Sequence, residues 1–124
     1  MDLKLTGRKA LVTGSTSGIG YAIVRQLAAE GAAVVLTGRT QAAVDASLAR
    51  LQAQVPGDRA EGIAADCATP DGAALVFARV PSVDILINNL GIYERRPFFD
   101  TPDADWQRLF EVNVMSGVRF ARHY

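Results

Sequence analysis

The fold of this chain is decided by the stretch Thr13-Gly14-Ser15-Thr16-Ser17-Gly18-Ile19-Gly20. A short apolar run at residues 9–13 precedes it and is predicted to be a strand, and apolar residues recur every three or four positions through residues 18–30, as on one helical face. A glycine-rich bend before a helix N-terminus lets backbone N–H groups approach a phosphate. We therefore predict a phosphate-binding loop, to which the hydroxyls of Ser15 and Ser17 add donors. The alternative is a turn that only joins strand and helix.

Outward from this loop, predicted strands and helices alternate four times. The run at 32–37 is continuously apolar, as in a parallel strand covered on both faces. This alternation is typical of βαβ units, so we predict one α/β domain over residues 1–124, a Rossmann-type doubly wound parallel sheet with helices on both faces. An α+β domain is the alternative. The further predicted strands are 59–65 and 84–88, and the further helices are 41–54, 70–79 and a last helix with Thr101 as its N-cap and Pro102 as its first residue.

Composition limits the classes of partner. Thirteen basic residues balance thirteen acidic ones among 124, which gives no electrostatic reason to expect nucleic acid or an anionic membrane as a partner. No apolar run approaches the roughly 20 residues of a membrane span, and the N-terminal residues contain no hydrophobic signal segment. The single cysteine, Cys67, excludes an internal disulfide and fits a reducing cytoplasm, where we expect the protein. We expect no metal site.

Two motifs carry a family resemblance. The Thr-Gly-x-x-x-Gly-x-Gly spacing at residues 13–20 and Asn88-Asn89-Leu90-Gly91 after the fourth predicted strand resemble the N-terminal half of a short-chain dehydrogenase/reductase, with leucine where that family has alanine. The resemblance covers the whole chain. It implies strand order 3-2-1-4, a homo-oligomer, and an NAD(P)-dependent oxidoreductase that transfers hydride between a nicotinamide cofactor and a carbonyl or alcohol substrate.

The residue after the second predicted strand bears on which cofactor is bound. In NAD-binding Rossmann units a carboxylate about 20 positions past the glycines binds the ribose 2′-hydroxyl. Here that region reads Gly38-Arg39-Thr40 and contains no carboxylate. A guanidinium suits the 2′-phosphate of NADP, so Arg39 favours NADP over NAD. The alternative is that Arg39 is a solvated surface residue.

The resemblance assigns further cofactor contacts. Asp66 is expected to accept a hydrogen bond from the adenine amino group, and the backbone N–H of Cys67 to contact the ring. Asn89 and Gly91 are expected to line the ribose and nicotinamide side, while the amide of Asn88 ties neighbouring strands together. The alternatives are that Asp66 caps a helix or turn and that both asparagines make only structural hydrogen bonds.

Family catalysis uses serine, tyrosine and lysine with a supporting asparagine, and only the last has a match here. Asn113 corresponds to the asparagine that holds a water in a proton relay to the lysine; a buried polar helix residue is the alternative. The only lysines are Lys4 and Lys9, and no Tyr-x-x-x-Lys pair occurs. We therefore interpret the chain as a portion of an oxidoreductase, incomplete at its C-terminus and inactive alone. A non-catalytic nucleotide-binding module and an inactive remnant remain open.

Several aromatic residues are left without a chemical role. Trp106 and Phe110 lie a helical step apart and are expected to pack, and His123 is expected at the surface. We also expect an open apolar edge on the fourth strand and an incompletely buried last helix. For three more residues, the core and the entrance to a substrate pocket are equally good placements: Tyr93, Phe98 and Phe99.

Overall fold

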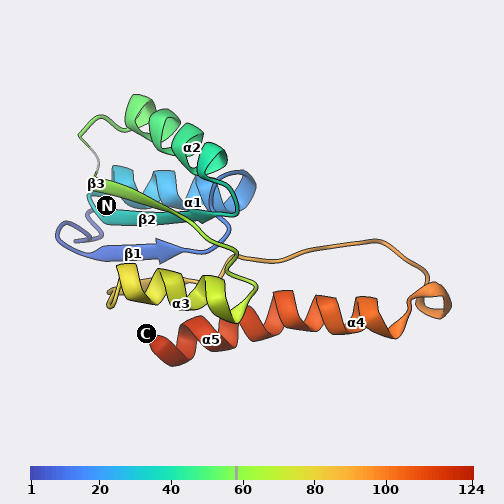
Figure 1. The fold of residues 1–124 in the computed structure, drawn as a ribbon. Helices are drawn as coiled ribbons and strands as arrows, with labels where there is room; N and C mark the ends of the chain where they lie inside the picture. The colour runs from blue at the N-terminus through green and yellow to red at the C-terminus, as the bar shows by residue number, and fades with distance from the viewer. Residues whose placement is uncertain (58) are drawn as a thin grey trace.

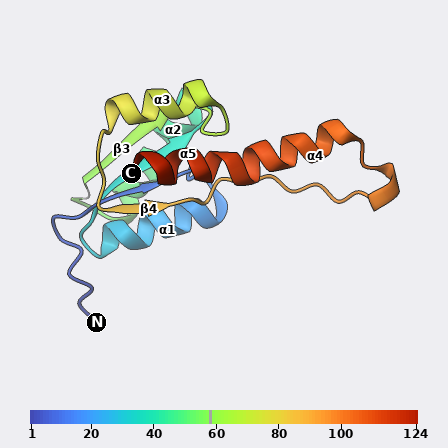
Figure 2. The ribbon, with the colours of Figure 1, turned by 90° about the horizontal axis from the view of Figure 1, so that it is seen from below.

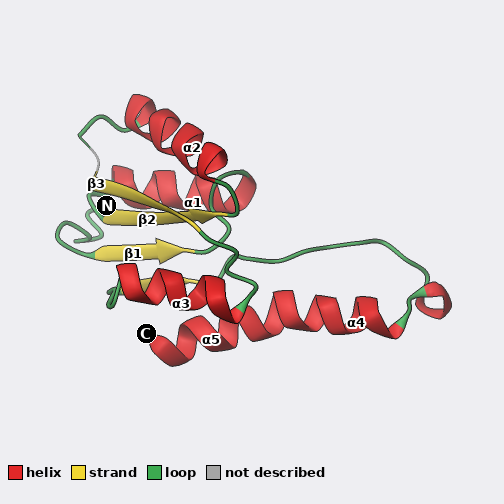
Figure 3. Ribbon diagram, in the orientation of Figure 1, coloured by secondary structure: helices red, strands yellow, loops and turns green. Residues whose placement is uncertain are grey.

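A parallel sheet of four strands forms the centre of the computed structural model, which describes residues 1–57 and 59–124. The strand order is β3-β2-β1-β4, and each neighbouring pair is parallel (Figure 3). Ala10 pairs with Val34 on one side and with Ile85 on the other. The predicted fold class and strand order are therefore confirmed. The strands are β1 (Lys9–Val12), β2 (Ala33–Gly38), β3 (Arg59–Ala64) and β4 (Ile85–Ile87).

Helices cover both faces of this sheet. In Figure 1, α1 (Gly18–Ala29) and α2 (Gln41–Gln54) lie on one face, and α3 (Pro70–Arg79) and α5 (Ser116–His123) lie on the other. Such two-sided coverage explains why β2 is apolar at successive positions. Val34 and Leu36 belong to the core cluster with α1 and α2, whereas Val35 belongs to the cluster that contains Phe120 of α5.

The segment between β4 and α5 leaves the body of the sheet. It contains a 3-10 turn, η1 (Phe98–Asp100), then α4 (Asp103–Phe110) and a π-helical turn, η2 (Glu111–Met115), which continues into α5. Figure 2 shows α4 and the strand-like loop before it projecting as an arm beyond the sheet. None of the α4 residues is buried. We call residues 92–110 the arm.

One prediction about the arm holds only in part and another is wrong. Trp106 packs edge-on against Phe98, with 6.0 Å between the ring centroids, but Trp106 and Phe110 stay 49% and 55% exposed, because helical spacing places residues on one face and does not supply a core for it. Thr101 does not cap α4, since its hydroxyl donates to the carbonyl of Pro97 and Pro102 takes the N-cap position. The predicted incomplete burial of the last helix is confirmed for α4, while Phe120 of α5 is fully buried.

The C-terminal helix is held against α3. The ring of His123 is exposed, as expected, yet it stacks on Phe77 with 4.0 Å between ring centroids. The hydroxyl of Tyr124 donates to the carbonyl oxygen of Val80 at 2.6 Å. Desolvation by burial raises the pKa of Tyr124 to about 12, and Cys67 adds to this shift. At the sheet edge, the residues of β4 are half-buried, and β4 pairs with β1 alone among the described strands.

Candidate cofactor-binding site

A cavity of about 450 Å³ opens at the carboxyl ends of the strands. In open α/β sheets this end is where ligands bind, next to the point at which the strand order reverses. Here the reversal lies between β1 and β4, because β1 is flanked by β2 on one side and by β4 on the other. The cavity lining comes from the loop before α1, the ends of β2, β3 and β4, and one face of the α4–η2 helix: Gly14, Thr16, Ser17, Thr37–Arg39, Ala65–Ala68, Leu90–Ile92, Arg108 and Val112.

Three glycines, one in the loop before α1 and two in the first turn of α1, are required for two different physical reasons. Gly14 and Gly18 have φ values of 60° and 57°, in the left-handed region that side chains rarely adopt. Gly20 is required by space, since an added Cβ would lie 2.5 Å from the Gly14 carbonyl oxygen and 2.6 Å from Nδ2 of Asn89. In the Gly-x-x-x-Gly-x-Gly motif, the first two glycines therefore allow backbone bends, and the third allows the helix to lie close to the loop.

Hydrogen bonds to Thr37 of β2 hold the loop before α1 in place. The backbone N–H of Gly14 donates to Oγ1 of Thr37, and the backbone N–H of Ser15 donates to the Thr37 carbonyl. The Ser15 hydroxyl donates to the carbonyl of Val12 at 2.6 Å and accepts from the backbone N–H of Thr37 at 3.0 Å. Ser15 is fully buried, so its hydroxyl is not available to a phosphate and the expected donor role for it is wrong.

Exposed donors lie at the start of α1, next to the cavity that Ser17 lines. Ser17, Gly18 and Ile19 are exposed, and the Ser17 hydroxyl makes no capping bond. Within residues 1–57 and 59–124, no hydrogen bond uses the backbone N–H of Gly18 or Ile19. Free N–H groups at a helix N-terminus carry partial positive charge and form an anion site. The loop is therefore open to a ligand rather than closed by packing.

The structural role expected of Asn88, to tie neighbouring strands together, is carried out by Asn89 instead. Nδ2 of Asn89 donates to the carbonyls of Thr13 and Gly14 at 3.2 and 3.0 Å, so Asn89 ties the neighbouring strands together. Asn88, to which that role was given, instead donates to the carbonyl of Gly117 in α5 at 3.4 Å. Adjacent side chains leave an extended chain on opposite sides, which is why only one of the pair reaches the loop.

Two threonines that the sequence reasoning missed connect these parts. Oγ1 of Thr13 accepts from the backbone N–H groups of Asn89 and Leu90, and Oγ1 of Thr37 accepts from that of Gly14. Both threonines are buried. The available signal was a polar residue at the end of each of two neighbouring apolar strands, where buried hydroxyls need partners.

Three further expected contacts lie at the ends of β2 and β3. Arg39 is exposed beside the cavity and forms no ion pair with any described residue. Asp66 uses Oδ1 to accept from the backbone N–H of Ala68 at 3.0 Å, which caps a turn, while Thr69 is the residue that caps α3. Cys67 is 3% exposed, and burial raises the pKa of its thiol, which fits a packing residue.

Asn113 lies in the π-helical turn and is tied to the loop after β4. Its Oδ1 accepts from the backbone N–H of Ile92 at 2.7 Å, and its Nδ2 donates to the Ile92 carbonyl at 2.9 Å. The contact also explains Gly91, where an added Cβ would lie 3.3 Å from Oδ1 of Asn113. A π-helical turn within an α-helix often marks a functional position. The residue pattern did not predict the π-helical turn at Glu111–Met115.

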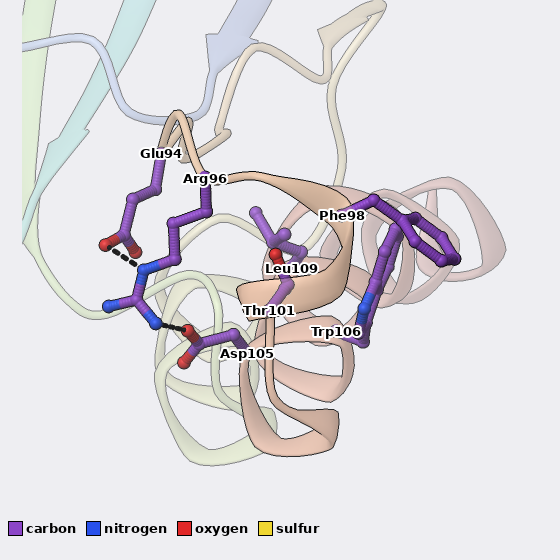
Figure 4. A pocket seen from close by; sticks show the side chains of 7 residues that line it. All are labelled: Glu94, Arg96, Phe98, Thr101, Asp105, Trp106 and Leu109. Atoms are coloured by element: carbon purple, nitrogen blue, oxygen red, sulfur yellow. Dashed lines mark hydrogen bonds and ion pairs between the residues drawn. The ribbon is translucent and has the colours of Figure 1, made fainter.

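A second cavity, of about 260 Å³, lies on the arm and is drawn in Figure 4. Arg96 bridges Glu94 and Asp105 at one end, and Phe98 and Trp106 face each other at the other end. A core placement for three aromatic residues is excluded, because their exposed fractions are 87%, 70% and 95% for Tyr93, Phe98 and Phe99.

Neither a metal cluster nor a membrane-crossing helix is present in the part of the chain that the structure describes. No three side chains of histidine, cysteine, aspartate or glutamate there are grouped so as to hold a metal ion. No helix there is both long enough and apolar enough to cross a bilayer.

Known proteins share both this fold and much of this sequence. The chain is 50% identical over 128 residues to the uncharacterized oxidoreductase YvaG of Bacillus subtilis, and 38% identical over 122 residues to the L-xylulose reductase of Bos taurus. These matches cover 100% and 98% of this chain but 47% and 48% of the relatives, so the chain spans about half of their length. A solved structure of L-sorbose reductase from Gluconobacter frateurii, complexed with NADPH and L-sorbose, superposes with a TM-score of 0.91 at 36% identity, over 99% of this chain and 48% of that one.

The family model described as short chain dehydrogenase matches residues 8–124, which includes the loop before α1, the Asn-Asn-Leu-Gly motif and Asn113. On this match the chain belongs to the short-chain dehydrogenase family.

Proposed function

We propose that this chain is the NADP-binding part of an oxidoreductase that transfers hydride between a nicotinamide cofactor and a small carbonyl or alcohol substrate. The observation that carries the proposal is the cavity at the strand ends, which is lined both by Arg39 and by Ser17, the residue that directly precedes the exposed N–H groups of Gly18 and Ile19. A dinucleotide phosphate is doubly negative at its diphosphate and carries a further phosphate on one ribose. The site offers positive charge for both.

The residues present fit this cofactor. The bend at Gly14 and Gly18 leaves the N–H groups of Gly18 and Ile19 exposed next to Ser17, which lines the cavity and whose hydroxyl adds a donor for the diphosphate. The guanidinium of Arg39 has no partner among the described residues and matches the geometry of a 2′-phosphate. Asp66 accepts from Ala68 through Oδ1, and no described residue donates to its Oδ2, which we propose accepts from the adenine amino group.

Asn89 and Asn113 position the loops of the proposed site. When bound, the cofactor supplies or accepts the hydride. Asn89 holds the phosphate loop against β4, and Asn113 fixes the loop after Gly91, next to which we expect the nicotinamide side. Because the sequence contains no Tyr-x-x-x-Lys pair, we propose that this chain alone binds cofactor without reducing a carbonyl. We also propose a homo-oligomer in the cytoplasm.

The similar proteins support the class of ligand. The L-sorbose reductase structure contains NADPH and L-sorbose, and the L-xylulose reductase is named for another sugar. Both names point to a polyhydroxylated carbonyl compound as the substrate class of the relatives. For this protein, we propose a small carbonyl or alcohol without further identity.

The experiment is a fluorescence titration of the protein with NADPH and with NADH. We expect NADPH to bind at least about tenfold more tightly, because a charge-assisted bidentate contact to the 2′-phosphate contributes on the order of 1.5–3 kcal/mol. Arg39→Ala should remove most of this preference and leave NADH binding unchanged. Arg122→Ala, which removes an exposed arginine from the end of α5, is the matched control. Equal affinities for the two cofactors in the parent protein contradict the role given to Arg39.

A further inference from the structure

Arg108 is a second arginine on the wall of the cavity, and it comes from a different part of the fold than Arg39. It lies in the last turn of α4 and lines the cavity together with Val112, one helical turn further along. Residues four positions apart share a helix face. One face of the α4–η2 helix thus presents a guanidinium and an apolar side chain to the cavity, opposite the ends of the strands.

The charge of Arg108 is not used elsewhere in the described protein. Two other arginines of this region are paired, Arg96 with Glu94 and Asp105, and Arg119 with Glu111, whereas Arg95 and Arg122 form no ion pair with a described residue and do not line the cavity. Arg108 is exposed and forms no ion pair or side-chain hydrogen bond with any residue in 1–57 or 59–124. An arginine on the wall of a cavity that has no partner among the described residues is available to a ligand.

The helix that carries Arg108 is anchored on the adenine side of the proposed site. Nη1 of Arg119 donates to the carbonyl of Ala68 at 3.1 Å, so the helix lies against the loop that contains Asp66. Asp66, Ala68 and Val112 all line the cavity. A purine ring there has an apolar contact in Val112 and a hydrogen-bond acceptor in Asp66, and it leaves one face for a flat cation. Guanidinium groups stack on aromatic faces.

We infer that Arg108 is a further cofactor-binding residue, which packs its guanidinium against the adenine base. The inference rests on the proposed function, because it takes the cavity as a dinucleotide site. It separates two tasks between two arginines. Arg39 distinguishes NADPH from NADH through the 2′-phosphate, whereas Arg108 contributes equally to every ligand that contains adenine.

The test measures the affinity of the parent protein and of Arg108→Ala for NADPH, NADH and 5′-AMP by isothermal titration calorimetry. We expect Arg108→Ala to weaken all three by a similar factor of about three to ten, the range of a partly exposed cation–π contact. Arg108→Lys should recover part of the loss, since an ammonium keeps the charge but not the flat stacking surface. Arg122→Ala serves as the control for removing a positive charge, and Arg108→Gln replaces the alanine variant if the latter does not fold.

The outcomes separate this inference from the proposed function. If the parent binds NADPH but Arg108→Ala binds all three ligands as the parent does, Arg108 makes no contact with the cofactor and the inference fails alone. If the loss is confined to NADPH, Arg108 contacts the 2′-phosphate and the adenine assignment is wrong. If the parent binds none of the three ligands, the proposed function fails, and the inference fails with it.

Discussion

Replacing Gly20 by alanine tests the close contact between α1 and the loop before it. Elsewhere in a helix, a glycine-to-alanine change stabilises the protein by roughly 0.5–1 kcal/mol, because glycine loses more backbone entropy on folding. At Gly20 the new Cβ would lie 2.5 Å from the Gly14 carbonyl oxygen, 2.6 Å from Nδ2 of Asn89 and 2.9 Å from Cα of Ser15. Two of these atoms belong to the backbone and have little freedom to move.

The expected cost follows from what must shift. Forcing an extra methyl into a packed region costs about 1–3 kcal/mol. Moving Asn89 also weakens its two hydrogen bonds, to the carbonyls of Thr13 and Gly14, which contribute about 1 kcal/mol each. After subtraction of the helix-propensity gain, we expect Gly20→Ala to lower the free energy of unfolding by roughly 2–4 kcal/mol.

Gly117→Ala is the matched control. Gly117 is also a helical glycine, in α5, but the atom nearest to an added Cβ is Nδ2 of Asn88 at 3.6 Å, an ordinary contact distance. We expect this variant to be as stable as the parent, or more stable by up to about 1 kcal/mol. Urea unfolding followed by circular dichroism measures both variants, with the slope checked for constancy.

The difference in free energy of unfolding between Gly20→Ala and Gly117→Ala tests whether α1 packs closely against the loop. If Gly20→Ala unfolds at the same urea concentration as Gly117→Ala, the loop does not pack against α1 as described. Lack of space for a side chain would then not be the reason for glycine at position 20. A reduced NADPH affinity without a loss of stability would show instead that the loop has moved while the core has not.

Two further predictions concern groups around the same site. Asn89→Ala should destabilise the protein by about 1–3 kcal/mol, because two loop carbonyls lose their donor. Asn88→Ala should change stability by less than about 0.5 kcal/mol, since its one hydrogen bond is long and exposed. Equal effects of the two variants in urea unfolding contradict the role given to Asn89. The raised pKa of Tyr124, about 12, means that its contribution to stability is complete below the unfolded-state value near 10 and is lost as pH rises through 12. The free energy of unfolding of the parent should therefore fall more steeply between pH 9 and 11.5 than that of Tyr124→Phe, and parallel curves rule out a partly buried, hydrogen-bonded hydroxyl.

Much of the site was predictable because it depends on local backbone chemistry. A glycine-rich bend between a strand and a helix has few other uses, and its place in the chain indicated the loop at residues 13–20. The position of Arg39 followed from counting along a βαβ unit. These inferences need only the order of the elements, which hydrophobic periodicity reports directly.

Two kinds of fact could be read only from the tertiary structure. One is which of two similar nearby side chains faces the cavity, and the other is whether an apolar helix face has anything to pack against. Ser15 and Ser17 are equivalent hydroxyls in the sequence, but Ser15 is turned inward under β2 and Ser17 faces the cavity. Trp106 and Phe110 have a helical spacing that predicts packing, yet they stay 49% and 55% exposed, and no residue of α4 is buried.

By itself, the amino-acid sequence determined the parallel α/β sheet, the order of its elements and the place of the phosphate loop, because periodicity and glycine spacing act over a few residues. Only the tertiary structure decided that Asn89 rather than Asn88 secures that loop, that Asn113 lies in a π-helical turn beside Ile92, and that Arg108 shares a cavity with Arg39. Those facts depend on contacts between residues 21 to 76 positions apart, which the packing of helices on a sheet brings together and no local pattern records.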